Sequence, residues 1–359
     1  MGSNSFGEIF VITTYGESHG AGIGVVIDGC PSGIPIDLDF IADELRRRKP
    51  GQNRFVTERN EDDLPQITSG IFEGKTTGAP IHIFIKNQDQ KPKDYENLQN
   101  LFRPSHADFT YQKKYGIRDF AGGGRSSARV TASWVAAGAV AKLLLKKIGV
   151  EIIAYVSQIG DISIPENIKI DTELIESDPL RCPDSETSHK MQHLLNLLKE
   201  DGDTIGGIIT CHIENLPVGL GNPVFHKLHA DLGKAILSIN ACKGFELGSG
   251  FSGVAMRGSE HNDAIECIDD RIRTKTNFSG GVQGGISNGM PVYFRAAFKP
   301  VSSIKMNQDT IDTDGKAINF SIEGRHDPCV VPRAVPIVEA MAALVVVDHW
   351  LMAKGSQFQ

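Results

Sequence analysis

The sequence contains few cysteines, and none of them lie close together. Six occur in 359 residues, and no CxxC pair is present. Zinc sites and disulfide frameworks use closely and regularly spaced cysteines, so this spacing excludes both and indicates reduced thiols. No HExxH pattern brings two histidines to metal-ligand spacing. We therefore expect no metal site.

The sequence also lacks an excess of positive charge and a long apolar run. Lysine and arginine number 37 against 44 aspartates and glutamates, which gives a net charge of −7 and a pI near 5.9. Nucleic-acid-binding domains normally have a pI above about 9, so nucleic acid is not an expected partner. No uninterrupted apolar run approaches the roughly 18 residues of a membrane span, and the N-terminus lacks the basic start of a signal peptide. We expect a cytoplasmic protein that does not enter a membrane.

No segment has the composition of an interdomain linker. A chain of 359 residues and 39.0 kDa is long enough for two domains or one large one. Hydrophobic residues make up 40% and charged residues 23%, which is typical of a globular protein and excludes a disordered chain. We predict one large domain over residues 1–359.

Glycine, by contrast, is abundant, with 38 residues often in clusters. Between the clusters, hydrophobic periodicity predicts alternating strands and helices. A helix begins after Asp37, a good N-cap residue, and ends at Pro50-Gly51. The stretch from Ala340 to Val347 is apolar on all sides and should be buried on every side. The other predicted elements are strands over 9–14, 24–28, 81–85 and 150–157, and helices over 127–148, about 186–200 and from Pro332 or Pro336 onward.

A weak internal repeat accompanies this alternation. Pro31-x-Gly33 and Pro217-x-Gly219 each follow a predicted strand and precede a predicted helix, about half a chain apart. Coincidence and a duplicated unit explain the match equally well. The alternation fits an α+β fold of two related halves packed around one helical layer.

The glycine run at 122–124 leads through Arg125, Ser126 and Ser127 into the predicted helix at 127–148. Glycines allow close approach of the backbone, and a helix start offers N–H donors, so the segment suits a phosphate. The lysine and spacing of a Walker loop are missing, which excludes a nucleoside triphosphatase. A serine-capped helix after a flexible turn explains the same residues.

Arg46, Arg47, Arg48 and Lys49 form a second candidate site in the last turn of the first predicted helix, and Arg54 follows. Cations stabilise a helix C-terminus, which is one explanation. Four in succession exceed that need and could bind a polyanionic ligand instead. Both interpretations remain open.

Histidines in rigid turns are further candidates. His19 lies in a glycine-flanked turn, His106 follows Pro104, and Asp327 follows Arg325 and a histidine. Active sites favour such loops on rigid scaffolds. The Gly248–Gly253 segment matches GxGxxG, but no long helix is predicted after it, so we reject a dinucleotide site.

Taken in order, several segments together resemble the chorismate synthase family. The resemblance implies a β-α-β sandwich fold with pseudo-twofold related halves, a homotetramer and reduced FMN as cofactor. It also implies a lyase that converts 5-enolpyruvylshikimate 3-phosphate to chorismate by anti-1,4-elimination of phosphate, without net redox change. The segments are Thr13–Gly20, Arg46–Arg54, Phe102–Asp108, Tyr115–Arg129, Gly244–Phe251, Gly280–Ser287, Lys299–Ser303 and Gly324–Pro328.

The resemblance also implies roles for individual residues. His19 and His106 would be acids, one serving the flavin and the other the leaving phosphate, and Asp327 the base that takes a proton from the flavin. Arg48 and Arg54 would bind the substrate. The implied FMN contacts are Arg125, Ser126, Ser127, Asn240, Ala241, Gly284, Lys299, Pro300, Val301, Ser302, Ser303 and Arg325.

Two other functions remain as alternatives, an NAD(P)H-dependent flavin reductase and a non-catalytic flavin-binding protein. For the lyase, NADPH would act only indirectly as a reductant. The sequence leaves open whether the protein reduces its own flavin or depends on an external flavin reductase.

Overall fold

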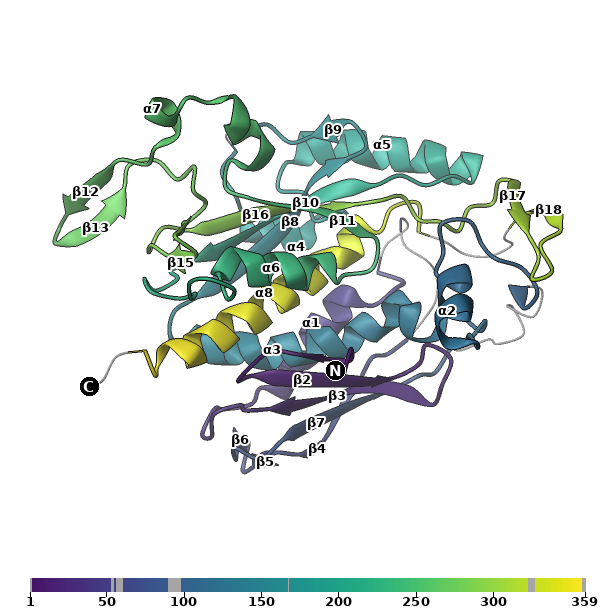
Figure 1. The fold of residues 1–359 in the computed structure, drawn as a ribbon, viewed down its shortest axis with the longest axis horizontal. Coiled ribbons are helices and arrows are strands. Elements are labelled where there is room, and N and C mark those ends of the chain that lie inside the picture. Colours follow the sequence, from purple (N-terminus) through teal and green to yellow (C-terminus); the bar gives the residue numbers. More distant parts are fainter. Residues whose placement is uncertain are drawn as a thin grey trace.

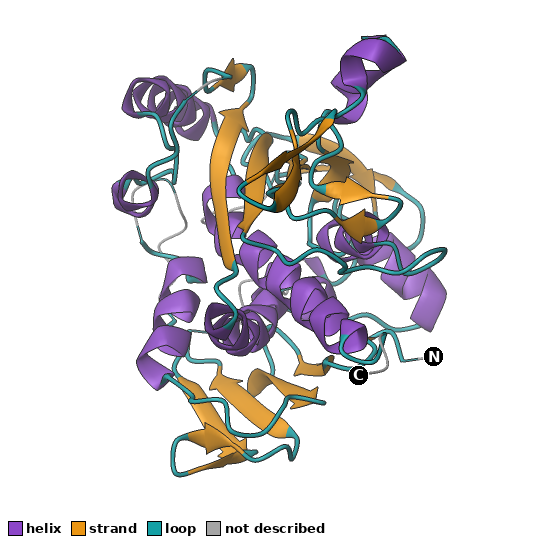
Figure 2. Ribbon diagram, turned by 90° about the vertical axis from the view of Figure 1, so that its left-hand side faces the viewer, coloured by secondary structure: helices purple, strands orange, loops and turns teal. Residues whose placement is uncertain are grey.

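Two antiparallel sheets enclose a layer of helices in the computed structural model, which describes residues 2–52, 55, 61–89, 98–166, 168–321 and 327–356. Figure 1 shows one sheet above the helices and the other below, and Figure 2 shows the same three layers after a quarter turn. The first five-stranded sheet has the order β1 (Ser5–Phe6), β2 (Val11–Gly16), β3 (Gly22–Asp28), β7 (Ile81–Lys86), β4 (Pro65–Ser69). The second has the order β11 (Cys242–Leu247), β16 (Val292–Phe298), β10 (Gly207–Glu214), β8 (Glu151–Ile159), β9 (Ile162–Ser163).

The other elements are the helices between the two sheets and several outer helices and short strand pairs. The helices between the sheets are α1 (Leu38–Arg48), α3 (Thr131–Lys147), α6 (Leu228–Leu237) and α8 (Val331–Ala353). The outer helices are α2 (Asp108–Tyr115), α4 (Thr172–Ser177), α5 (Ser185–Asp201) and α7 (Gly258–His261). The short strand pairs are β5 (Ile71–Phe72) with β6 (Lys75–Thr76), β12 (Ile265–Ile268) with β13 (Arg271–Thr274), β14 (Val282–Gln283) with β15 (Ile286–Ser287), and β17 (Gln308–Ile311) with β18 (Ala317–Phe320).

The two halves of the chain have the same topology. The spatial order β2-β3-β7-β4 in the first sheet matches β8-β10-β16-β11 in the second. In each half a helix follows the central strand, α1 after β3 and α6 after β10, and a long helix, α3 or α8, closes the half. This confirms the predicted α+β sandwich of two pseudo-twofold related halves.

Hydrogen bonds at the Pro-x-Gly turns show that the internal repeat is not a coincidence. In the first half, Thr76 Oγ1 donates to the carbonyl of Pro31 at 2.7 Å; in the second, Ser287 Oγ donates to the carbonyl of Pro217 at 2.6 Å. Each hydroxyl also accepts a bond from the backbone N–H three residues beyond its proline, at 2.9 and 2.8 Å respectively. The same network at the same place favours a duplicated αβ unit.

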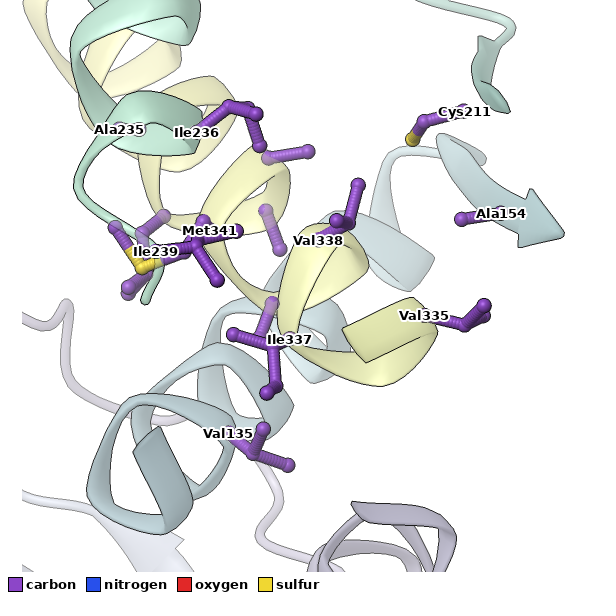
Figure 3. Close-up of a cluster of buried hydrophobic side chains, with 14 of the residues drawn as sticks. Val135, Ala154, Cys211, Ala235, Ile236, Ile239, Val335, Ile337, Val338 and Met341 are labelled. Atoms are coloured by element: carbon purple, nitrogen blue, oxygen red, sulfur yellow. The ribbon is translucent and has the colours of Figure 1, made fainter. Parts of the chain in front are cut away.

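The core lies where α3 and α8 cross. A Cβ atom on Gly138 of α3 would lie 2.4 Å from the Cβ of Ala340 of α8, so the helices meet almost backbone to backbone. Every residue from Ala340 to Val347 is buried, as predicted. Figure 3 shows Val338 and Met341 of α8 in one buried cluster with Ile236 of α6, and Met341 lies beside Ile239. Residues 128–147 and Val331–Ala353 are long and apolar enough to span a membrane, but 78% and 83% of their windows are buried inside the protein, as in core helices.

The predicted helix 127–148 begins later than expected. Two short 3₁₀ turns, Gly124–Ser126 and Ala128–Val130, precede α3, which starts at Thr131. Ser127 has an extended backbone, and its side chain accepts a hydrogen bond from the N–H of Arg129. Ser127 therefore caps the second 3₁₀ turn, whereas α3 has no side-chain cap and the glycine run does not enter it directly. The N-cap at Asp37 is confirmed by its bond from the N–H of Phe40 at 3.0 Å.

Candidate active site

A cavity of about 460 Å³ lies where the two halves meet, a typical size for a small-molecule site. The end of α1, the loop before α2, the turns before α3 and the start of α8 contribute to its wall. Most of the candidate residues line this one cavity: Arg48, His106, Ser126, Ser127, Asn240, Ala241, Lys299, Pro300, Val301, Ser302, Ser303 and Asp327.

The glycine run brings the two candidate histidines together. A Cβ atom on Gly122 would lie 2.1 Å from Cε1 of His19, and one on Gly123 would lie 3.2 Å from Cε1 of His106. Both glycines have a positive φ, +68° and +83°, which side chains rarely adopt. The two neighbouring glycines therefore leave room for the imidazole rings of His19 and His106 to pack against one turn.

His106 is oriented by a buried carboxylate. Its Nδ1 lies 2.9 Å from Oδ1 of Asp108, which also accepts bonds from Arg103 Nε and Nη2 at 2.7 and 2.8 Å. Burial opposes ionisation of Asp108, but the hydrogen bonds from Arg103 and His106 outweigh it and hold the pKa of this carboxyl well below its usual range. An ionised Asp108 holds Nδ1 in a hydrogen bond, so Nε2 is the nitrogen left to exchange a proton with a ligand.

His19 is held from its own turn and from the glycine run. Its Nδ1 lies 3.0 Å from the hydroxyl of Ser18, and that hydroxyl lies 3.3 Å from the carbonyl of Gly122. Ser18 is fully buried. The ring is thus fixed against the segment that also contacts His106.

Two buried guanidinium groups share one carboxylate in the wall of the cavity. Arg48 Nη2 donates to Oδ2 of Asp63 at 2.7 Å, and Arg129 Nη1 donates to Oδ1 of the same residue. Burial, with the positive charges of Arg333 and Arg129, lowers the pKa of Arg48 to about 10, while Asp63 acts in the opposite direction. Arg48 Nε and Arg129 Nη2 are buried and have no hydrogen-bond acceptor within the described part of the chain. Glu61 Oε2 lies 3.8 Å from Arg129 Nη2, too far for a hydrogen bond, so both nitrogens have an unused donor.

Asp327 forms an ion pair at the edge of the cavity. Arg333 Nη1 donates to Oδ2 of Asp327 at 2.6 Å, and Arg333 Nε lies 3.5 Å from the carbonyl oxygen of Arg48. The base candidate is therefore linked to the arginine cluster through the first turn of α8.

Two further residues that line the cavity have a strained backbone. Ser105 and Ala241 have positive φ values of 57° and 65°, and such residues gather at functional sites. Lys299 joins them, since its Nζ donates to the carbonyl of Ser105 and its backbone N–H to that of Ala241, both at 3.0 Å. Asn240 Nδ2 donates to the carbonyl of Ser126 at 2.8 Å. Its buried Oδ1 accepts no bond from any residue that the structure describes.

Two candidate cofactor residues lie elsewhere. Arg125 donates to the carbonyl of Gly16 and to the side chains of Asn4 and Thr14 at 3.1, 3.0 and 2.7 Å, and so holds strand β2. Gly284 lies in the turn between β14 and β15 and does not line the cavity; Figure 1 shows β15 at the left of the molecule and α2 at the right. Arg54 and Arg325 lie outside the described residues.

The arginines of the basic run lie in different surroundings. Arg46 pairs with Asp43 on the surface, and Arg47 belongs to an ion cluster on another side of α1. Within the basic run of α1, Arg48 is the residue that lines the cavity. Among the described residues, no three His, Cys, Asp or Glu side chains are grouped to hold a metal.

Comparison with known proteins identifies the family. A family model described as chorismate synthase matches residues 10–351. The chorismate synthase of Cytophaga hutchinsonii is 56% identical over 355 residues, which cover 98% of this chain and 99% of that protein. The chain belongs to the chorismate synthase family. The relative from Christiangramia forsetii is 55% identical over 358 residues, covering 99% of this chain and 100% of its own. A crystal structure of a chorismate synthase matches with a TM-score of 0.77 and 30% identity over 98% of this chain and 94% of its own.

In this member of the chorismate synthase family, sequence reasoning missed several residues of the cavity. Arg129 lies within a matched segment but was counted only as part of a helix. Arg333, which also lines the cavity, and Asp63, which bonds to Arg48 and Arg129 behind it, belong to no sequence motif. Their grouping depends on contacts between distant segments, so no signal in the sequence could have found it.

Proposed function

We propose that this chain catalyses the elimination of phosphate from 5-enolpyruvylshikimate 3-phosphate to give chorismate, the last step of the shikimate pathway. The reaction makes it a carbon–oxygen lyase acting on phosphates. One observation carries the proposal: in a chain of this family, two arginines that each have a buried donor without an acceptor line the same cavity as His106 and the Asp327–Arg333 pair.

Substrate binding rests on the arginines. The substrate carries two carboxylates and a phosphate ester, and each charge-assisted hydrogen bond to such a group contributes about 1.5–3 kcal/mol. Arg48 has a pKa of about 10 and so stays cationic at neutral pH. Arg48 Nε and Arg129 Nη2 supply the donors, and Asp63 keeps both guanidinium groups in place. We also assign Arg54 to this role, as the family resemblance implies.

Asn240 and the segment from Lys299 to Ser303, which also line the cavity, suit a flavin. Reduced FMN, when bound, would supply an electron that is later returned, so that no net redox change results. The buried Oδ1 of Asn240 matches a ring N–H donor, and the wall from Lys299 to Ser303 combines hydroxyl, backbone and apolar groups. The residues assigned to the cofactor are Ser126, Ser127, Asn240, Ala241, Lys299, Pro300, Val301, Ser302 and Ser303, with Arg125, Gly284 and Arg325 from the family resemblance.

Proton transfer is assigned to His19, His106 and Asp327. His106 would act through Nε2, because Asp108 engages Nδ1. Asp327 would accept a proton while Arg333 fixes one of its oxygens. General acid–base catalysis of this kind accelerates a reaction by roughly 10²–10⁴-fold.

We further propose that the enzyme is a cytoplasmic homotetramer in which residues 1–359 form one domain. Flavin would be reduced by an external reductase, with NADPH entering only through that reductase. This assignment predicts that NADPH and FMN alone support no turnover, whereas an added flavin reductase restores it.

The deciding experiment is anaerobic release of phosphate from the substrate. We expect release with chemically reduced FMN and none with oxidised FMN or without flavin. Equal release under all three conditions would contradict the proposal. Steady NADPH consumption with FMN alone would indicate a flavin reductase, and FMN binding without phosphate release would indicate a non-catalytic flavoprotein.

A further inference from the structure

Asn87 is a buried amide at the end of β7 that contacts two parts of the candidate active site. Its Nδ2 donates to the carbonyls of Glu17 and Gly20 at 3.0 and 2.9 Å, on either side of His19. Its Oδ1 accepts from Arg129 Nε at 3.0 Å. The side chain is 4% exposed. Asn87 thus joins the turn that carries His19 to a guanidinium of the anion site.

These partners allow only one orientation of the amide. Two carbonyl oxygens require N–H donors, and a guanidinium N–H requires an acceptor. Both amide protons and the oxygen are therefore used. The backbone N–H of Asn87 also donates to the carbonyl of Ala21 at 3.2 Å, so Asn87 bonds to three carbonyls of the segment from Glu17 to Ala21.

The connection continues from Arg129 into the cavity. Arg129 Nη1 donates to Asp63, which in turn accepts from Arg48. Asp63 has a positive φ of 52° and a fully buried side chain. Since each member has well-defined partners, a shift of Arg129 toward a bound anion would be transmitted to the His19 turn through one side chain.

We propose that Asn87 is a positioning residue that couples occupation of the anion site by a phosphate or carboxylate to the placement of His19. The inference rests on the proposed function, because it takes Arg48 and Arg129 as the anion site and His19 as an acid. Asn87 itself would touch neither substrate nor cofactor.

Asn87→Asp separates the two halves of this contact. The carboxylate keeps an acceptor for Arg129 but offers no donor to the carbonyls of Glu17 and Gly20. We expect kcat for phosphate release to fall about tenfold or more in Asn87→Asp and in the neutral variant Asn87→Ser, because a misplaced catalytic group is costly. KM for the substrate should change little in Asn87→Ser, whereas the new negative charge beside Arg129 should raise it in Asn87→Asp. Asn215→Asp is the matched control: Asn215 is exposed and donates one bond to the carbonyl of Gly149, so the same change should leave both constants unaltered.

A second readout needs no turnover. In protein with ¹³Cε1-labelled histidines, we expect inorganic phosphate to shift the His19 and His106 resonances of the wild type, assigned from His19→Gln and His106→Gln. In Asn87→Asp, phosphate should still shift His106 but no longer His19. If phosphate fails to shift His19 in the wild type, or shifts it equally in the variant, the coupling is refuted.

A neutral variant covers the case in which Asn87→Asp does not fold. Asn87→Ser also lacks both amide donors and introduces no charge, and it should show the same loss of the His19 response. The outcomes remain distinct from those for the proposed function. Phosphate release by the wild type with reduced FMN tests the reaction, whereas the histidine shifts test the coupling whether or not turnover occurs.

Discussion

Gly122 and His19 pack so closely that a Cβ atom on the glycine would lie 2.1 Å from the Cε1 atom of the histidine. The contact joins residues 103 positions apart in the sequence. It places the imidazole of His19 against the glycine turn that also packs against His106. It also explains why a side chain at position 122 would not fit without a shift of His19.

Gly122→Ala should therefore displace His19 and strain the turn. We expect a loss of roughly 10²-fold in kcat and of about 1–3 kcal/mol in the free energy of unfolding. Steady-state kinetics and urea unfolding measure the two effects. Gly74→Ala is the control, since Gly74 has a similar φ of +73° but nothing within 4 Å of the added Cβ. Wild-type activity in Gly122→Ala would show that His19 does not depend on this contact.

Arg48→Lys should weaken substrate binding. A lysine has one charged nitrogen in place of the guanidinium fork, so it cannot both pair with Asp63 and present the donor that Arg48 Nε supplies. Loss of a charge-assisted bond worth about 1.5–3 kcal/mol predicts a rise in KM of roughly 10- to 150-fold. Arg46→Lys, on the exposed side of the same helix turn, should leave KM unchanged. Equal KM values for the two variants would remove Arg48 from the site.

Asp108→Asn should lower kcat by disturbing His106. The amide can present its N–H to Nδ1, which favours the wrong tautomer and removes the charge that orients the ring. We expect a fall of about 10²-fold or more at saturating substrate and reduced FMN. Asp119→Asn is a nearby control, since the carboxylate of Asp119 accepts a bond from the N–H of Ala121 and, among the described residues, forms no hydrogen bond with His106. An unchanged kcat in Asp108→Asn would argue against proton transfer by His106.

Glu339→Gln should destabilise the fold and change its acid sensitivity. Glu339 is 3% exposed and accepts from Arg47 and Lys142, each at 2.6 Å. Burial raises the pKa of Glu339, but the two cations outweigh it and lower the pKa well below the ordinary 4.5. The ion pairs therefore stabilise the protein above about pH 4.5, and this contribution is lost as pH falls toward the lower folded-state pKa.

At neutral pH, Glu339→Gln removes a buried carboxylate from Arg47 and Lys142, which keep Glu44 as a shared counter-ion, while Arg47 also keeps Glu176. Loss of the charge-assisted bonds to Glu339 predicts a loss of about 1.5–3 kcal/mol in the free energy of unfolding. The difference in the free energy of unfolding between the variant and the wild type should become smaller at acid pH. Urea unfolding across a pH series would measure it. Glu186→Gln removes an exposed partner of Lys190 and should leave the unfolding curve unchanged. A difference that stays constant down to pH 3 would contradict the assignment.

Local sequence determined most of the elements and the order of the site segments. The cap at Asp37, the periodicity of α5 and the uniformly apolar stretch of α8 act over a few residues, so they could be predicted from neighbours in the chain. The repeated Pro-x-Gly turn left duplication and coincidence equally open in the sequence, because the hydroxyls that bond to Pro31 and Pro217 lie 45 and 70 residues away. The site candidates came from loop chemistry and family resemblance, and most of them line one cavity.

Tertiary structure alone decided which charges belong together. Three adjacent arginines in α1 differ little in sequence, yet one is exposed, one enters the Glu339 cluster and one lines the cavity, because a helix turns each in a different direction. The pairing of Arg48 with Asp63, of Asp327 with Arg333 and of Asn87 with Arg129 depends on burial and distance between separate segments. Local propensity carries no information about such contacts, since only the packed helical layer brings these groups within hydrogen-bonding distance.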